Sequence, residues 1–304
     1  MRIFVTGVCG QLGHDVMNEL NKRGHEAVGS DLAPNYNGIQ DSSAVTEMEY
    51  ISLDVTNAEA VGKVIREVSP DVVIHCAAWT AVDLAEDLDK IETVRAVNAY
   101  STQNIASVCK ELDCKMVYIS TDYVFGGSGN DPWKPDCTDF NPLNVYGQTK
   151  LEGERAVAST LQKYFIVRIA WVFGTCGKNF VRTMLSIGKK YDMVRVVNDQ
   201  IGTPTYTFDL ARLLVDMVET DKYGYYHATN EGGYISWYDF ACEIFRQAGY
   251  TTNVIPVTTE EYGQSKAARP FNSRLDKSKL TNTGFTPLPN WQDALCRYLK
   301  EIKE

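Results

Sequence analysis

The stretch RIFVTGVCGQLG (2–13) decides the fold. Its first six residues form a short apolar run of strand type, and apolar residues at helical spacing follow over 11–24. Gly7, Gly10 and Gly13 stand at this strand-to-helix junction, where glycine permits a tight turn and lets a pyrophosphate approach the backbone. The helix N-terminus then offers free N–H groups and its positive dipole end. The pattern predicts a dinucleotide site, which we extend to Gln11 and Leu12.

Alternating segments extend this first unit into an α/β architecture. The strand-type runs are 2–7, 26–31, 50–54, 71–77, 115–121 and 164–174, and the helix-like stretches between them include 11–24, 58–68 and about 89–112. Such alternation predicts a Rossmann-type, doubly wound parallel sheet covered on both faces. Beyond residue 174 helix-like stretches dominate. We therefore expect an NAD(P)-binding domain over 1–174 and a smaller α+β lobe, mainly for substrate, over 175–304, with segments free to interleave.

Composition narrows the class of protein and its location. The formal net charge of −9 over 304 residues argues against nucleic-acid binding, which needs clustered Lys and Arg, so an anionic ligand must be met locally. The eight cysteines form no C-x-x-C pair and no metal-ligand spacing with histidine, which favours reduced thiols and no metal. No apolar run approaches membrane-spanning length, and no targeting segment precedes the first strand. We expect a cytoplasmic protein without a membrane partner; a homodimer stays open.

Further residues extend the predicted cofactor site along the strand ends. Asp31 closes the second strand, about 20 residues after the glycines, where a carboxylate accepts hydrogen bonds from ribose hydroxyls and repels a 2′-phosphate. It therefore favours NADH over NADPH. Asp54 and Val55 follow the third strand and Ala77 and Ala78 follow the fourth, so these pairs are expected to border the adenine and the cofactor backbone.

A tyrosine and a lysine four residues apart provide the candidate catalytic pair. The spacing occurs twice, as YGQTK (146–150) and YGQSK (262–266). On a helix it places both side chains on one face, and an adjacent ammonium is expected to lower the phenol pKa. Only Tyr146 and Lys150 follow a buried strand that ends in a hydroxyl, Thr121. We assign catalysis to these three residues and a surface role to the second pair.

Longer blocks carry a family resemblance over nearly the whole chain. They are CAAWTAVDLAE (76–86), ISTDYVF (119–125), PLNVYGQTKLEGE (142–154), VRIAWVFG (167–174), NFVRTML (179–185), DQIGTPT (199–205) and RPFNSRLDKSKL (269–280). Together with the glycine turn they resemble the extended short-chain dehydrogenase/reductase family, and within it the dTDP-4-dehydrorhamnose reductases. The resemblance implies hydride transfer from NADH or NADPH to the 4-keto group of a dTDP-deoxy-sugar.

The resemblance also implies a role for each catalytic residue. Tyr146 is then the general acid, Lys150 holds the nicotinamide ribose and tunes the tyrosine, and Thr121 positions the ketone. The implied sugar-facing wall consists of Thr80, Val82, Tyr123 and Trp171, with Thr80 also near the cofactor. Arg269 and Arg274 are candidates for the nucleotide diphosphate, because guanidinium matches phosphate geometry.

Other members of the same family provide competing predictions. A sugar-nucleotide dehydratase needs an acid pair after the threonine, and here Thr121-Asp122 is followed by Tyr123, which disfavours dehydration. A 4-epimerase, which keeps NAD bound through turnover, stays open. A non-catalytic regulatory subunit also stays open, because the β subunit of methionine adenosyltransferase resembles this family too.

Overall fold

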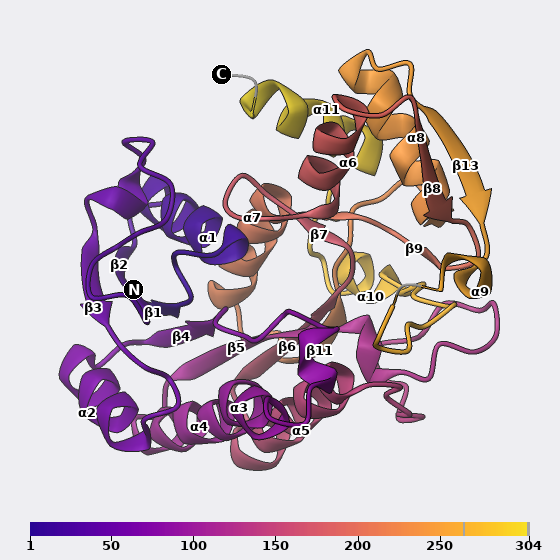
Figure 1. The fold of residues 1–304 in the computed structure, drawn as a ribbon. Helices are drawn as coiled ribbons and strands as arrows, with labels where there is room; N and C mark the ends of the chain where they lie inside the picture. The colour runs from indigo at the N-terminus through magenta and orange to yellow at the C-terminus, as the bar shows by residue number, and fades with distance from the viewer. Residues whose placement is uncertain (264, 303–304) are drawn as a thin grey trace.

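A seven-stranded parallel sheet forms the centre of the first lobe (Figure 1). The computed structural model describes residues 1–263 and 265–302. The strand order is β11-β6-β5-β4-β1-β2-β3. The strands are β1 (Arg2–Thr6), β2 (Glu26–Asp31), β3 (Glu49–Ser52), β4 (Val72–His75), β5 (Lys115–Thr121), β6 (Tyr164–Ile169) and β11 (Gly224–His227). The central residues of β1, β2, β4, β5 and β6 are buried on both faces, as the near-continuous apolar runs predicted, whereas the edge strand β3 is only partly buried.

Helices cover both faces of this sheet (Figure 1). On one face lie α1 (Gln11–Lys22) and α7 (Thr207–Val218); on the other lie α2 (Ala58–Val68), α4 (Ser101–Glu111) and α5 (Val145–Thr160). Five short elements connect these helices and strands. They are η1 (Ala44–Thr46), η2 (Leu84–Glu86), α3 (Ile91–Arg95), the π-helical turn η3 (Ala96–Tyr100) and η4 (Asp122–Val124). The predicted doubly wound α/β class is confirmed.

The first lobe also takes chain from beyond residue 174. Strand β11 pairs with β6 in parallel, and α7 packs against α1. Without β11, the apolar strand β6 would form an exposed edge of the sheet. Residues 207–218 and 224–227 therefore pack in the first lobe although they lie beyond the predicted boundary at 174. The sequence analysis had left such interleaving open.

The second lobe consists of helices packed on short strand pairs (Figure 1). Its elements are β7 (Val172–Phe173), α6 (Phe180–Gly188), β8 (Met193–Val197), β9 (Ile201–Gly202), β10 (Thr205–Tyr206), β12 (Ile235–Ser236), α8 (Trp237–Ala248), β13 (Asn253–Val257), α9 (Thr259–Tyr262) and α11 (Trp291–Glu301). The short helix α10 (Ser278–Asn282) packs instead on β11, and its Leu280 joins the core of the first lobe. An aromatic core that includes Phe173, Phe240 and Tyr298 holds it together. In the described part of the chain, no helix is both long and apolar enough to cross a membrane.

Candidate active site

The glycine turn lies at the point where the strand order reverses. Strand β1 pairs with β2 on one side and β4 on the other, and the carboxyl ends of β1 and β4 at such a reversal are where sheets of this type bind nucleotides. Gly7 has a φ of +75°, and a Cβ there would lie 2.6 Å from the backbone N of Ala77. A Cβ on Gly13 would lie 2.2 Å from the Gly7 carbonyl oxygen, whereas one on Gly10 would meet nothing nearer than 3.3 Å. Neighbouring backbone therefore excludes a side chain at Gly7 and Gly13, whereas space remains at Gly10, where a pyrophosphate can approach the backbone.

A paired substitution separates these two glycine roles. Gly13→Ala should lower the free energy of unfolding by about 1–3 kcal/mol, because its Cβ overlaps backbone that has no room to move. Gly10→Ala should keep the fold and weaken cofactor binding. Urea unfolding and nicotinamide fluorescence titration measure the two effects. Equal losses of stability in both variants would contradict the difference in space between Gly10 and Gly13.

Asp31 lies at the end of β2 and contacts the glycine turn directly. Its Oδ2 accepts a hydrogen bond from Cys9 N at 2.9 Å and its Oδ1 accepts one from Leu32 N at 2.8 Å. The carboxylate therefore braces the turn and remains at the strand end where a ribose is expected. Asp54 is exposed and accepts both its hydrogen bonds from Thr56, as a turn-forming aspartate does.

The other predicted cofactor contacts lie after β3, after β4 and at the start of α1. Ala77 donates its N–H to Thr6 Oγ1 at 3.2 Å, which joins the loop after β4 to the end of β1. Ala78 is half-buried and Thr80 exposed on that same loop, while Val55 is half-buried after β3. Leu12 is buried in α1, and Gln11 Oε1 accepts a hydrogen bond from Asn179 Nδ2 at 3.0 Å in the second lobe.

Thr121, Tyr146 and Lys150 meet at the carboxyl end of β5. Asn144 caps α5 by accepting a hydrogen bond from Gly147 N at 2.8 Å, which starts the helix just before Tyr146. The Tyr146 phenol lies near enough to the Thr121 hydroxyl for the threonine to affect the tyrosine pKa. Lys150, one turn further, is buried, with its Nζ 4.1 Å from the centre of the Tyr118 ring. The structure thus brings the three predicted catalytic residues together.

The second tyrosine–lysine pair lies elsewhere. Tyr262 ends the short helix α9 with its side chain exposed, and Lys266 forms an ion pair with Asp87 on the surface. Neither has a strand-end hydroxyl as its described partner.

Burial controls the charge of the catalytic pair. It raises the pKa of Tyr146, and the nearby Thr121 hydroxyl only partly offsets this. Burial also lowers the pKa of Lys150 to about 7, against the opposing effects of Glu154 and Cys76. The expectation that the lysine lowers the tyrosine pKa is therefore wrong for this structure, since desolvation of the phenolate is the larger effect. The phenol stays protonated, which is the form that a proton donor needs.

A wall of polar and aromatic groups faces the catalytic residues. The Tyr123 ring packs edge-on against Tyr146, with centroids 5.8 Å apart. Arg269 Nη1 donates to Tyr123 Oη at 3.2 Å, and its Nη2 pairs with Asp83 Oδ2 at 2.7 Å. Arg269 is therefore an anchored cation. Val82 is half-buried on the loop that carries Asp83.

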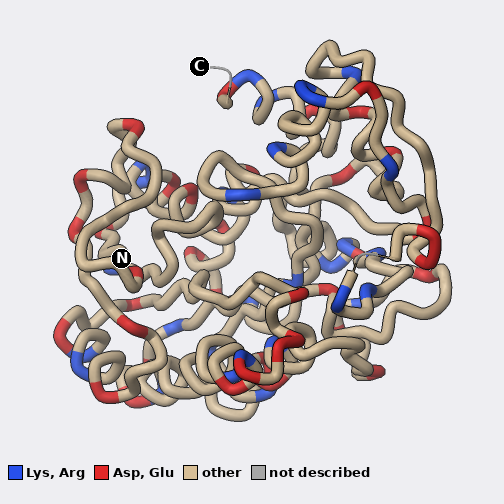
Figure 2. Tube along the Cα trace, in the orientation of Figure 1, with Lys and Arg blue, Asp and Glu red and all other residues tan. Residues whose placement is uncertain are grey.

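Arg274 is the other predicted phosphate contact. Its guanidinium donates to Asn272 Oδ1 at 3.0 Å, and within residues 1–263 and 265–302 no acidic group pairs with it. Figure 2 shows basic residues gathered along the segment that runs from α9 into α10; they are Lys266, Arg269, Arg274, Lys277 and Lys279. In an acidic protein this segment meets the need for a local positive charge.

Trp171 adopts an unusual backbone conformation between β6 and β7. Its φ is +51°, which is costly for a bulky residue without local compensation. Its ring stacks on Trp237 with centroids 3.8 Å apart. The turn packs the half-buried Trp171 side chain against the core of the second lobe.

The sequence analysis missed Asn98, which lies under the loop after β4. Its Oδ1 accepts from Trp79 N at 2.8 Å, and its Nδ2 donates to Trp79 O at 3.2 Å and to Thr149 Oγ1 at 3.1 Å. These contacts tie the cofactor-side loop to α5. Asn98 sits in the π-helical turn, and such turns often occur at functional sites but have no simple sequence pattern.

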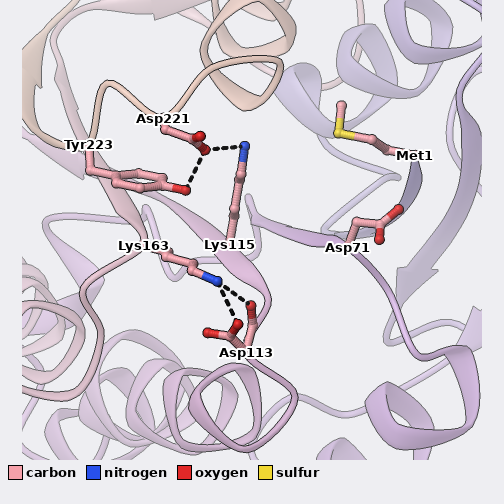
Figure 3. A pocket seen from close by; sticks show the side chains of 7 residues that line it. All are labelled: Met1, Asp71, Asp113, Lys115, Lys163, Asp221 and Tyr223. Carbon is pink, nitrogen blue, oxygen red and sulfur yellow. Dashed lines mark hydrogen bonds and ion pairs between the residues drawn. The ribbon is translucent and has the colours of Figure 1, made fainter.

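A separate hollow lies at the amino ends of the strands, on the opposite edge of the sheet (Figure 3). Its side chains are already paired: Lys115 with Asp221 at 2.9 Å, and Lys163 with Asp113 at 2.6 Å. In this type of sheet ligands bind at the carboxyl ends. The predicted catalytic residues lie at the carboxyl edge, which is therefore the candidate functional edge.

Comparisons with known proteins place this architecture in a family. The model of the RmlD substrate binding domain matches residues 1–304. A dTDP-4-dehydrorhamnose reductase of Streptomyces griseus is 38% identical over 97% of this chain and 91% of its own. The spore coat polysaccharide biosynthesis protein SpsK of Bacillus subtilis (strain 168) is 36% identical over 99% and 97%.

Solved structures agree with these sequence matches. A crystal structure of a dTDP-4-dehydrorhamnose reductase from Clostridium acetobutylicum superposes with a TM-score of 0.89 at 39% identity and covers 100% of both chains. The Bacillus anthracis dTDP-4-dehydrorhamnose reductase, solved in complex with NADP, gives 0.87 at 38% identity and 99% of both. The chain belongs to the dTDP-4-dehydrorhamnose reductase family of oxidoreductases, within the extended short-chain dehydrogenase/reductases.

Proposed function

We propose that this protein reduces dTDP-4-dehydro-L-rhamnose to dTDP-L-rhamnose with NADH or NADPH. The observation that carries the proposal is the meeting of Thr121, Tyr146 and Lys150 beside the glycine turn at one edge of the sheet. The family relatives are named for this reaction.

Each residue has a task that its surroundings support. When bound, the nicotinamide supplies a hydride to C4 of the sugar. Tyr146 donates its phenolic proton to the oxygen that gains charge, and burial keeps that proton in place beforehand. Thr121 holds the carbonyl oxygen beside the phenol. Lys150 holds the nicotinamide ribose, and its ammonium stabilises the charge that develops on Tyr146.

The substrate diphosphate is assigned to Arg274, with Arg269 as support. Arg274 has donors that no described acidic group occupies, whereas Arg269 is paired with Asp83 and orients Tyr123. Thr80, Val82, Tyr123 and Trp171 remain our proposed sugar-facing wall.

An assay of cofactor oxidation with product analysis tests this function. Supplied with a panel of nucleotide-linked 4-keto sugars, the protein should oxidise NAD(P)H in proportion to the sugar reduced. An epimerase would interconvert sugars with no net oxidation and would retain NAD through purification. The absence of any reaction with every sugar would favour a regulatory subunit.

Cofactor choice depends on Asp31. We expect the protein to bind NADH at least as well as NADPH, because a carboxylate at the end of β2 repels a 2′-phosphate. Asp31→Asn keeps a hydrogen-bond acceptor for Cys9 N and should narrow the difference in affinity. Nicotinamide fluorescence titration of both proteins measures this. A clear NADPH preference in the unaltered protein, as the NADP complex of the Bacillus anthracis relative would suggest, would remove Asp31 from the ribose contact.

A further inference from the structure

The carboxyl group of Asp122 lies directly behind the hydroxyl of Thr121. Asp122 is 2% exposed, and its Oδ1 is 3.0 Å from Thr121 Oγ1 in a hydrogen bond. Its Oδ2 is buried and forms no hydrogen bond of ordinary geometry with the described residues, although the Ser273 hydroxyl is near enough to favour the ionised form. A buried carboxyl group in this position must influence which way the threonine proton points.

The hydrogen-bond capacity of Thr121 shows why this matters. A hydroxyl has one proton to donate and two lone pairs. Thr121 Oγ1 accepts from Tyr123 N at 3.2 Å. If Asp122 is ionised, it accepts only, so the single Thr121 proton must go to it. Thr121 then has no proton left for a substrate carbonyl. If Asp122 is protonated, it donates to Thr121, and the threonine proton is free to point into the site.

We propose that Asp122 is a positioning residue that works in its protonated form, donating a hydrogen bond to Thr121 Oγ1 so that the Thr121 proton points to the substrate carbonyl oxygen. The carboxyl group keeps its proton through the reaction, and Tyr146 remains the group that gives a proton away. The proposal rests on the function proposed above and adds the protonation state of one residue behind the same site.

The surroundings of Asp122 raise the share of this protonated form above that of an exposed aspartate. The groups that face it are Thr121 and Tyr123 beside it in the chain, Tyr146 from α5 and Ser273 from the segment before α10. No lysine or arginine forms an ion pair with it in the part of the chain that the structure describes. Burial raises its pKa to about 6, against the smaller opposing effects of the Ser273 and Thr121 hydroxyls. Tyr123 and Tyr146 are neutral over the pH range in which Asp122 titrates, because burial raises their pKa values as well.

The pH dependence of kcat/KM in Asp122→Asn tests the proposal. Asparagine keeps the shape and donates Nδ2–H to Thr121 at every pH. In the unaltered protein, kcat/KM should fall by about tenfold per pH unit above the pKa of Asp122. In Asp122→Asn the decline should begin only above the pKa of Lys150, which is about 7, so the variant should be the more active of the two above the pKa of Asp122. The same decline in both proteins, or a loss of more than about a hundredfold in the variant at every pH, would overturn the proposal.

Asp209→Asn is the matched control. Asp209 is also a buried carboxylate, but it pairs with Arg297 at 2.7 Å in the second half of the chain, away from the catalytic residues. Its variant should keep the pH-dependent decline of the unaltered protein. If the decline moved to higher pH there too, it would not belong to Asp122.

Infrared difference spectroscopy separates this proposal from the proposed function. A carboxylic acid C=O band present in the unaltered protein near pH 5 and absent from Asp122→Asn shows a protonated Asp122 without any substrate. Sugar reduction without that band would overturn the role of Asp122 alone. The band without any sugar reduction would overturn the proposed function and, with it, the role that we assign to the protonated carboxyl group.

Discussion

Tyr146→Phe should lower kcat for ketone reduction by about a hundred- to ten-thousand-fold, the range that a positioned general acid contributes. The substitution removes one oxygen from a half-buried ring that packs edge-on against Tyr123. The fold should therefore persist, and cofactor binding should be nearly unchanged. Steady-state kinetics with dTDP-4-dehydro-L-rhamnose and a fluorescence titration of NAD(P)H measure the two quantities.

Tyr262→Phe is the control for this experiment, because Tyr262 has the same sequence context at a surface position. Its kcat should stay close to that of the unaltered protein. Equal losses in the two variants would show that catalysis was assigned to the wrong pair.

Arg168→Met should lower the free energy of unfolding by about 3–5 kcal/mol, because it leaves the Glu154 carboxylate buried without its cation. Both side chains of this pair are 1% exposed. Arg168 Nε and Nη2 donate to the two Glu154 oxygens at 2.8 Å each, and Nη1 donates to the Pro135 carbonyl at 3.1 Å. The pair joins β6 to α5 one turn beyond Lys150, so its loss should also disturb the catalytic helix.

Two further variants show whether the effect comes from the unpaired charge. The double variant Glu154→Met with Arg168→Met should be more stable than Arg168→Met alone, because no charge is left buried. Arg66→Met breaks an exposed, equally bidentate pair with Glu111 and should leave stability nearly unchanged. Urea unfolding measures all three. A double variant as unstable as the single one would contradict this explanation.

Local patterns predicted much of the fold. The helix expected over 58–68 and the strand expected over 115–121 have the same bounds in the structure. Both are set by short-range periodicity of apolar residues, which the sequence displays directly. The glycine turn was predicted for the same reason, since its spacing and its place at the first strand-to-helix junction are local.

Contacts between distant residues were not predictable from such patterns. Strand β11 joins the first sheet through pairing with β6, about 60 residues earlier in the chain. Asp83 and Arg269 are 186 residues apart, so the ion pair that anchors the arginine left no signal. The raised pKa of Tyr146 depends on burial in the folded protein, and the helical spacing to Lys150 alone suggested the opposite direction.

The candidate catalytic site was predictable only in part, because some of its residues follow from local patterns and others from contacts between distant residues. Thr121, Tyr146 and Lys150 were predicted because each follows from a strand end or a helix face. Asn98 and Asp122, which hold a loop and a hydroxyl in place, were not singled out. Their importance depends on which backbone and side-chain atoms lie next to them after folding.

The central claim is that this protein transfers a hydride from NAD(P)H to C4 of the sugar. Transfer of a label from the cofactor tests this claim most directly. The protein is incubated with dTDP-4-dehydro-L-rhamnose and NAD(P)H that carries deuterium at C4 of the nicotinamide, prepared separately in each stereochemical form. With one of these forms, the account predicts deuterium at C4 of the reduced sugar and one oxidised cofactor for each sugar formed. Sugar conversion without deuterium at C4, or without net oxidation of the cofactor, would contradict it.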